Sequence, residues 1–193
     1  MRGETLRVFE SMQAIYRVAL TPKEYADQSF EKQVGKPENC AHCGRANSLE
    51  ALGFYSRWVS HLLEALRIRV RRFICLRCRV SISCLPDFAQ PYRVVQTATV
   101  QAGFREQSSK EVLHWGWLIV AYWKKFSAHL PQLLGRVGSA FGPCPAGVDP
   151  KEFWRLLMDE CPELALATRR LVDEFHTCLY GHYRCHQGKD FSK

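Results

Sequence analysis

The sequence has no long hydrophobic run. Its longest apolar stretch, Trp115 to Trp123, is about half the length that spans a bilayer. The first residues also lack the apolar core of a secretory signal peptide. Because neither a membrane span nor an export signal is present, we expect a soluble cytoplasmic protein with no membrane partner.

An even cysteine set, as a disulfide framework needs, is also lacking. The chain has nine cysteines, of which four form two C-x-x-C pairs. The remaining five are Cys84, Cys144, Cys161, Cys178 and Cys185. An odd remainder argues against disulfide pairing and for a reducing compartment.

Sequence signals of catalysis are missing as well. There is no glycine-rich loop for phosphates, and no serine or cysteine stands beside a plausible base. The acidic residues after position 100 fall mostly at expected helix starts or on solvated faces, whereas a nuclease gathers carboxylates around two magnesium ions. We therefore expect a binding protein and not an enzyme.

The two C-x-x-C pairs are the strongest positive signal. Cys40 and Cys43 are followed, after 31 intervening residues, by Cys75 and Cys78. Each pair can turn both thiolates toward one ion, and two pairs complete a tetrahedral shell. This spacing predicts a structural Zn²⁺ in a zinc ribbon, with no open position for catalysis. Iron in place of zinc, two disulfides or two unrelated pairs are the alternatives.

Positive charge is concentrated around these cysteines. The net charge of the chain is +8, and residues 40–93 hold nine arginines against three acidic residues. From Leu66 to Phe73 basic and apolar residues alternate, so a strand would place Arg67, Arg69 and Arg71 in one solvent-facing row. Guanidinium groups bind phosphate oxygens in pairs, which favours a nucleic-acid surface over a merely solvated face.

The periodicity predicts an α+β protein, in which a small four-cysteine zinc-ribbon β domain precedes an α-helical domain. Strands are expected over 52–59, 66–74 and 79–84. The expected units are an N-terminal helical arm at 1–36, the ribbon at 37–93, a helical region at 94–134, a glycine- and proline-rich linker at 135–148, and C-terminal helices at 149–193.

Several local signals sharpen this outline. Apolar positions at helical spacing predict an amphipathic helix over residues 4–20. Thr21-Pro22 and Asp149-Pro150 have the composition of helix starts. Gly44 follows the first C-x-x-C pair, where the backbone commonly needs a positive φ. Arg79 holds the same place in the second pair, so we expect strain of about 1 kcal/mol there.

Four segments resemble a bacterial family of transposase-associated zinc-ribbon proteins. They are Cys40-x-x-Cys43-Gly44, Phe54-Tyr55-x-Arg57-Trp58, the run from Arg67 to Cys78, and Leu85-Pro86-Asp87-Phe88-x-x-Pro91-Tyr92-Arg93. In such proteins a helix-turn-helix typically follows, and Trp123-Lys-Lys-Phe126 with Leu130-Pro131 is similar to its end. The resemblance covers residues 37–135 and implies a role beside, or descent from, a transposase.

The helical region departs from that pattern. The segment from Val94 to Glu111 is short for a two-helix DNA reader, and the helix expected from Ser108 to Leu130 is too apolar to present a polar face to base edges. We therefore expect a degenerate helix-turn-helix with a buried helix. Its phosphate candidates are Lys110, Lys124 and Lys125.

The resulting hypothesis is a zinc-ribbon DNA-binding protein, with duplex preferred to single-stranded DNA. The expected phosphate contacts are Arg67, Arg69, Arg71, Arg72 and Arg77, followed by Arg57, Arg79 and Arg93. We expect Tyr55 and Trp58 to pack in the core, although they could stack on single-stranded bases. The alternative is a zinc-stabilised interaction module whose helical half binds a protein. A second metal site in the Cys- and His-containing tail, residues 176–186, fits no ligand pattern.

Overall fold

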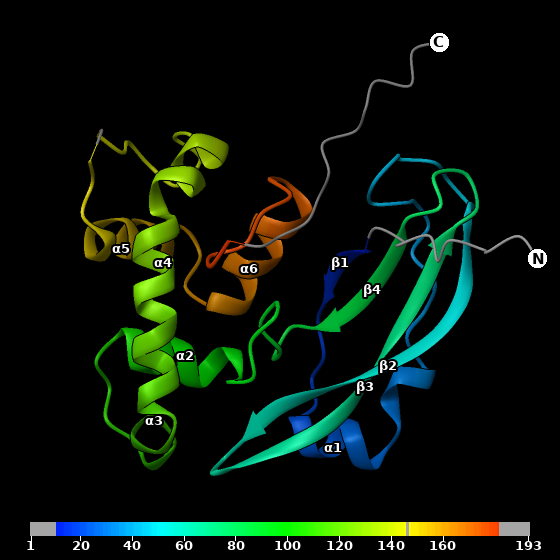
Figure 1. Ribbon diagram of the computed structural model, residues 1–193, viewed down its shortest axis with the longest axis horizontal. Coiled ribbons are helices and arrows are strands. Elements are labelled where there is room, and N and C mark those ends of the chain that lie inside the picture. Colours follow the sequence, from blue (N-terminus) through cyan, green and yellow to red (C-terminus); the bar gives the residue numbers. More distant parts are fainter. Residues whose placement is uncertain (1–10, 146, 182–193) are drawn as a thin grey trace, which may run out of the picture.

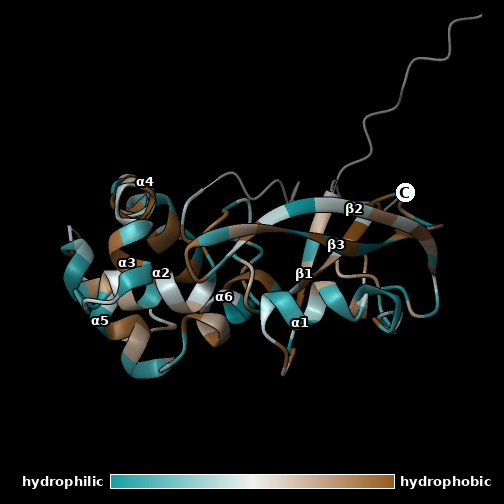
Figure 2. Cartoon of the chain, turned by 90° about the horizontal axis from the view of Figure 1, so that it is seen from below, coloured by the Kyte–Doolittle hydropathy of each residue, from teal (hydrophilic) through white to brown (hydrophobic). Residues whose placement is uncertain are grey.

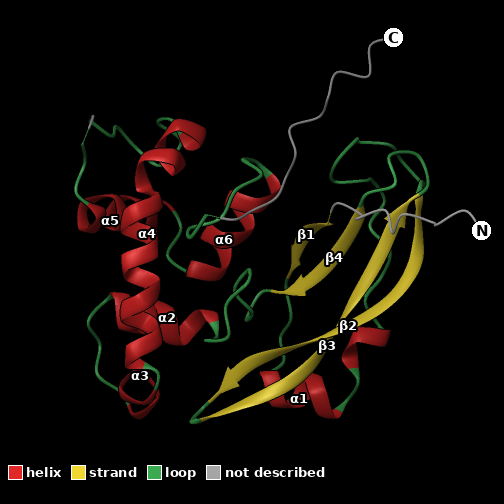
Figure 3. Cartoon of the chain, viewed as in Figure 1, coloured by secondary structure: helices red, strands yellow, loops and turns green. Residues whose placement is uncertain are grey.

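The structure is a computed structural model that describes residues 11–145 and 147–181 (Figure 1). It has a mixed α and β fold, in which a four-stranded sheet lies beside a group of helices (Figure 3). The strands are β1 (Ser11–Tyr16), β2 (Leu49–His61), β3 (Glu64–Cys75) and β4 (Ser81–Pro86). The helices are α1 (Pro22–Asp27), the 3-10 turn η1 (Phe30–Lys32), α2 (Thr97–Phe104), α3 (Lys110–His114), α4 (Gly116–Val137), α5 (Pro150–Glu160) and α6 (Leu164–Asp173).

The sheet has the strand order β1-β4-β3-β2. Strands β2 and β3 form a long antiparallel hairpin in which Leu49 lies opposite Cys75 and His61 lies opposite Glu64. Strand β4 is antiparallel to β3 and parallel to β1. The three strands expected from the sequence are confirmed, although the hairpin strands extend further at both ends. No helix in the described ranges is long and apolar enough to cross a membrane.

The expected helix over residues 4–20 is wrong where the structure describes it, because Ser11–Tyr16 is the edge strand β1. Residues 1–10 of that prediction lie outside the described residues. Met12, Gln13 and Ile15 are all buried, although Gln13 and Ile15 point to the opposite side from Met12. A strand covered on both faces beside a parallel partner does not show polar and apolar alternation. Its apolar residues then fit helical spacing by coincidence.

The helices build their own core. Phe126 and Leu133 from α4 and Phe153 from α5 are fully buried at its centre. The helix expected from Ser108 to Leu130 is divided at Trp115 into α3 and α4. Helix α4 also runs on to Val137, three residues into the expected linker.

The rest of the expected linker is part of the core. Phe141 is fully buried, and its ring lies 6.4 Å from that of Phe153. Glycine-rich composition predicted the break in regular structure here, but it did not predict that an aromatic side chain fixes the segment to α5.

Both predicted helix starts are confirmed. The Thr21 side chain accepts a hydrogen bond from the Glu24 N–H, and the Glu24 carboxylate accepts one from the Thr21 N–H. Asp149 caps α5, with Pro150 at its first position. Helix α6 lies between β1 and the other helices (Figure 1). The tail histidines and Cys185 fall outside the described residues, except His176.

Candidate metal centre and arginine-lined faces

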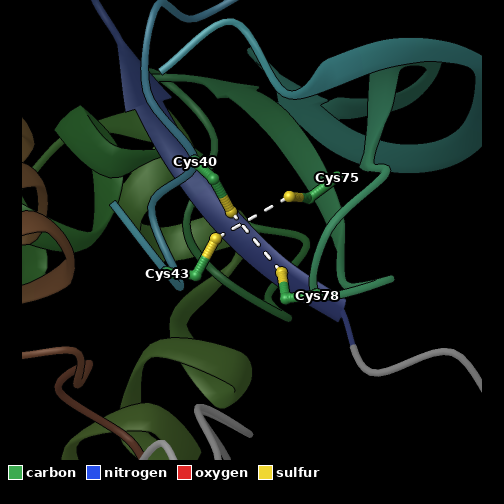
Figure 4. A group of neighbouring side chains, drawn as sticks. All are labelled: Cys40, Cys43, Cys75 and Cys78. Carbon is green, nitrogen blue, oxygen red and sulfur yellow. Dashed lines mark hydrogen bonds between the residues drawn. The ribbon is translucent and has the colours of Figure 1, made fainter. Parts of the chain in front are cut away.

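Four cysteine side chains converge at one end of the sheet (Figure 4). The Cys40 and Cys78 sulfur atoms lie 3.7 Å apart, and the Cys43 and Cys75 sulfur atoms lie 3.8 Å apart. All four sulfur atoms are within 4.8 Å of one another. A tetrahedron with Zn–S bonds of about 2.3 Å has S···S edges of about 3.8 Å. The four thiols therefore fit a closed, four-coordinate metal site.

The disulfide alternative is wrong for these cysteines. All eight cysteines in the described residues are free thiols, including Cys84, Cys144, Cys161 and Cys178. Cys84 is buried in the same apolar cluster as Cys40 and Cys75, but it is not one of the four grouped ligands. Four converging thiols without a disulfide are what a metal-binding ribbon requires.

The two C-x-x-C turns share one hydrogen-bond pattern. In the first turn the Cys40 N–H donates to the Arg45 carbonyl at 3.0 Å, and the Gly44 N–H donates to the Cys40 carbonyl at 2.8 Å. In the second turn Cys75 and Arg79 donate the equivalent bonds at 3.0 and 2.8 Å. The first turn precedes β2 and the second joins β3 to β4, so the pairing of Leu49 with Cys75 brings the turns together.

The expected backbone strain is also present. Gly44 has a φ of 68°, and Arg79 has a φ of 63° at the equivalent position. The left-handed region suits glycine and disfavours a residue with a Cβ atom. The matched geometry confirms that the second turn carries strain which the first avoids.

Hydrogen bonds tune the thiol of Cys75. Burial raises its pKa, but the N–H groups of Cys78 and Arg77 and the Ser48 hydroxyl outweigh burial and lower the pKa to about 6. The Ser48 oxygen lies 3.2 Å from the Cys75 sulfur. Burial raises the pKa of Cys40. The spacing of the cysteines could not predict the contact of Ser48 with Cys75, because the pairing of β2 with β3 brings these two residues together.

The alternation along β3 is confirmed. Ile68 and Val70 are fully buried on one face of the strand. Arg67 and Arg69 are exposed on the other face, and Arg71 beside them is half-buried. Residues two apart on a strand are separated by about 6.6–6.8 Å. The three arginines therefore form a row, which we call the β3 arginine row.

Aromatic rings and one acid hold this row in place. The Arg69 and Arg71 guanidinium carbons lie 4.5 and 4.6 Å from the centre of the Phe54 ring. Arg71 also lies 5.4 Å from the Phe73 ring centre. The buried Glu31 carboxylate is 3.6 Å from Arg69 and offsets part of its charge. Arg67 forms no ion pair with any residue that the structure describes.

More arginines surround the metal end. Arg77 and Arg79 are exposed, as expected for phosphate contacts. Arg45 is exposed as well, and with Arg77, Cys43 and Gly44 it lines a hollow of about 610 Å³. Arg45 was not among the expected contact residues. Its place directly after Gly44 in the first turn was the signal that could have identified it.

Arg57, Arg72 and Arg93 differ from the other arginines. One terminal nitrogen of Arg57 donates to the carbonyls of Gln90, at 2.9 Å, and Arg93. Burial lowers the pKa of the Arg57 guanidinium. Arg72 points to the other face of β3 from Arg71 and donates to the Ser81 hydroxyl at 3.0 Å. These three arginines lie away from the β3 arginine row.

Two expectations about aromatic residues need correction. Trp58 was expected in the core, but 54% of it is exposed, while Tyr55 is half-buried. Trp58 lies opposite the exposed Arg67, on the uncovered face of the hairpin, whereas the next residue of β2, Val59, points to the other face and is fully buried. Helix α4 buries Ile119 and Tyr122, as expected for a buried helix, yet 72% of Trp117 on the same helix is exposed.

No protein-family model, curated protein or solved structure matches this chain. Its function is therefore inferred from the grouped thiols, the exposed arginines and the pockets of the fold. Lys110, Lys124 and Lys125 are exposed along α3 and α4 and add positive charge to the helical half.

Proposed function

We propose that this chain is a zinc-stabilised protein that binds duplex DNA through the β3 arginine row. Sulfur separations of 3.7 and 3.8 Å support zinc, since they match the edges of a tetrahedral zinc thiolate site. The resemblance of residues 37–135 to transposase-associated ribbons supports the further proposal that this DNA belongs to a recombination system. There the protein acts as an accessory to, or is a remnant of, a transposase.

The β3 arginine row is the observation that carries this proposal. Its three side chains start from alternate residues on one face of a strand, and Phe54 contacts the guanidinium groups of Arg69 and Arg71. A planar guanidinium can bind two phosphate oxygens at once, and pre-orientation reduces the entropy lost on binding. Arg77 and Arg79 extend the basic surface around the zinc. Closed zinc coordination leaves the ion a structural role.

A salt titration tests this function. We expect zinc-loaded protein to bind random duplex DNA, with an affinity that falls linearly on a log–log plot as salt rises. Replacing Arg67, Arg69 and Arg71 by alanine should reduce the slope by about 2.7, at about 0.9 per lost phosphate contact. Fluorescence anisotropy at four salt concentrations measures this slope.

A matched control removes the same charge elsewhere. Alanine at Arg136, Arg155 and Arg169 takes three positive charges from exposed positions of the helical half. We expect this variant to retain most of the slope. If both triple variants bind alike, net charge alone drives binding and the β3 arginine row is not the site.

A second candidate function is protein binding through α3 and α4. Leu113 is 74% exposed and Trp117 is 72% exposed. Both side chains are large and apolar, and their exposure to water is unfavourable. An interface built on them would respond little to salt. The absence of duplex binding at low salt would favour this function over DNA binding.

A further inference from the structure

A pocket of about 600 Å³ opens on the sheet away from the β3 arginine row. Its walls come from all four strands and the segment before α2, and they include Tyr55, Arg57, Arg72, Ser83, Tyr92 and Arg93. Arg72 pairs with Ser83 across the sheet, whereas Arg71 pairs with Cys84, so the Arg72 side of the pocket lies on the face opposite the row. Trp58, which lies opposite Arg67, borders the pocket at the sheet edge. The volume is within the range of about 300–1,000 Å³ typical of small-molecule sites.

The three arginines of this pocket have no acidic partner. Arg57, Arg72 and Arg93 form no ion pair with any described residue, and no acid lines the pocket. The Nε atoms of all three are buried and make no hydrogen bond within the described chain. Removing guanidinium charges from water is unfavourable unless an anion accompanies them. The pocket therefore has the chemistry of an anion site.

Hydrogen bonds leave specific donors available. A guanidinium has five N–H donors, and the bond of Arg72 involves only one terminal nitrogen, whereas Arg57 bonds two main-chain carbonyls and also interacts with the Tyr55 side chain. Arg93 stacks on the Tyr180 and Tyr122 rings, at 4.9 and 5.5 Å, and so holds its wall in place. Arg72 can donate its remaining N–H groups to a phosphate in the pocket.

Aromatic rings add a second requirement for the ligand. The Tyr55 ring centre lies 6.0 Å from the Arg72 guanidinium carbon, and Tyr92 forms another part of the wall. A planar ring can stack on tyrosine while its attached phosphate meets the arginines. A nucleotide joins these two groups at a suitable size for the pocket.

We propose that this pocket binds one nucleotide unit, with its phosphate at Arg72 and its base on Tyr55. The nucleotide can be a free mononucleotide or the 5′-phosphorylated end of a single strand, because both present the same chemistry. This site is separate from the β3 arginine row. It stands or fails independently of duplex binding.

Isothermal titration of the zinc-loaded full chain with AMP, adenosine and inorganic phosphate tests the site. We expect AMP to bind about tenfold more tightly than either fragment, because only AMP makes both contacts. Arg72→Ala should weaken AMP binding about tenfold through loss of charge-assisted hydrogen bonds. Arg136→Ala, which removes an exposed arginine of the helical half, is the matched control and should leave AMP binding unchanged.

A second variant covers the case in which Arg72→Ala fails to fold. Tyr55→Leu keeps an apolar side chain and both arginines, so it should lower the advantage of AMP over inorganic phosphate and leave phosphate binding unchanged. AMP binding no tighter than phosphate binding would overturn the proposal, as would equal AMP affinity in wild type, Arg72→Ala and Tyr55→Leu.

Competition against AMP distinguishes the two sources. Octathymidylate with a 5′-phosphate should displace AMP if strand ends are ligands, and the same strand without the phosphate should not. Displacement by neither strand identifies a free nucleotide as the ligand. If the protein binds AMP but does not bind duplex DNA, the proposed DNA-binding function is wrong and the proposed nucleotide site is not affected.

Discussion

The metal end and the helical half of this protein are stabilised by different means. Around the four thiols the buried cluster has six members, and three of them, Cys40, Cys75 and Cys84, are cysteines. In the helical half, by contrast, Phe104, Trp154 and their neighbours form a continuous group of aromatic rings in edge-to-face and tilted contacts. Figure 2 shows apolar residues concentrated where these helices face one another.

This difference indicates which half depends on a ligand for its stability, the thiol end or the helical half. A small apolar cluster gives little stability by burial alone, so the metal that we propose at the four thiols would supply the rest. Large buried aromatic side chains contribute far more apolar area and need no ion. The halves meet where Ile15 of β1 and Val172 of α6 share one buried cluster. Loss of the metal should therefore unfold one end first.

Cys75→Ser tests this comparison with the largest expected effect. The change removes one of four ligands, and structural zinc sites contribute on the order of 10 kcal/mol to folding. We expect metal loss and rapid amide hydrogen exchange in β2 and β3, with α4 still protected. Metal content and exchange measured by mass spectrometry provide the readout.

The matched control for that variant is Cys161→Ser. Cys161 is a buried free thiol of the helical half. It should keep the full metal content. A metal-free Cys75→Ser protein that still unfolds cooperatively with protected hairpin amides would show that the thiols are not needed for the sheet.

Phe126→Ala tests the other side of the comparison. Phe126 is fully buried and its ring contacts those of Trp123 and Trp154. Truncation should destabilise the helical half by about 3–5 kcal/mol, through lost burial and a residual cavity. Urea unfolding followed by tryptophan fluorescence measures the loss.

Metal content separates this effect from a global one. Phe126→Ala should bind metal as wild type does at low denaturant, and Phe126→Leu should lose clearly less stability because it leaves a smaller cavity. Simultaneous loss of metal and helical structure in Phe126→Ala would show that the two halves fold as one unit.

Features fixed by local chemistry could be predicted from the sequence. Ligand spacing identified the four thiols, because a C-x-x-C turn has the same geometry in many folds. Period-two alternation identified the buried face of β3 at Ile68 and Val70. Because Gly44 and Arg79 hold equivalent positions in the two turns, the sequence also predicted the positive φ angle of Arg79.

Features set by distant partners could not be predicted. Strand β1 exists because β4 accepts it as a parallel neighbour, and nothing within residues 11–16 indicates that partner. The exposure of Trp58 follows from its place on the uncovered face of the hairpin, opposite Arg67. The proposed nucleotide pocket combines side chains from segments far apart in the chain, so the sequence alone grouped Arg57 and Arg72 with the other phosphate contacts.

The smallest expected effect lies within the metal end itself, at the two equivalent turn positions. Arg79→Gly should stabilise the metal end by about 0.5–1 kcal/mol, since relief of left-handed strain exceeds the entropy cost of glycine. Gly44→Ala should destabilise it by a similar amount. A Cβ atom at Gly44 meets no other atom within 4 Å, so the backbone alone sets that cost.

Metal-dependent unfolding of both variants in chelator measures these changes. Opposite signs at the two positions would establish that the turns are equivalent in energy as well as in geometry. Because both turn positions lie at the thiol end, neither variant should change the urea midpoint of the helical half. Equal shifts in both halves would instead mean that the metal end and the helices share one cooperative transition, which contradicts the comparison.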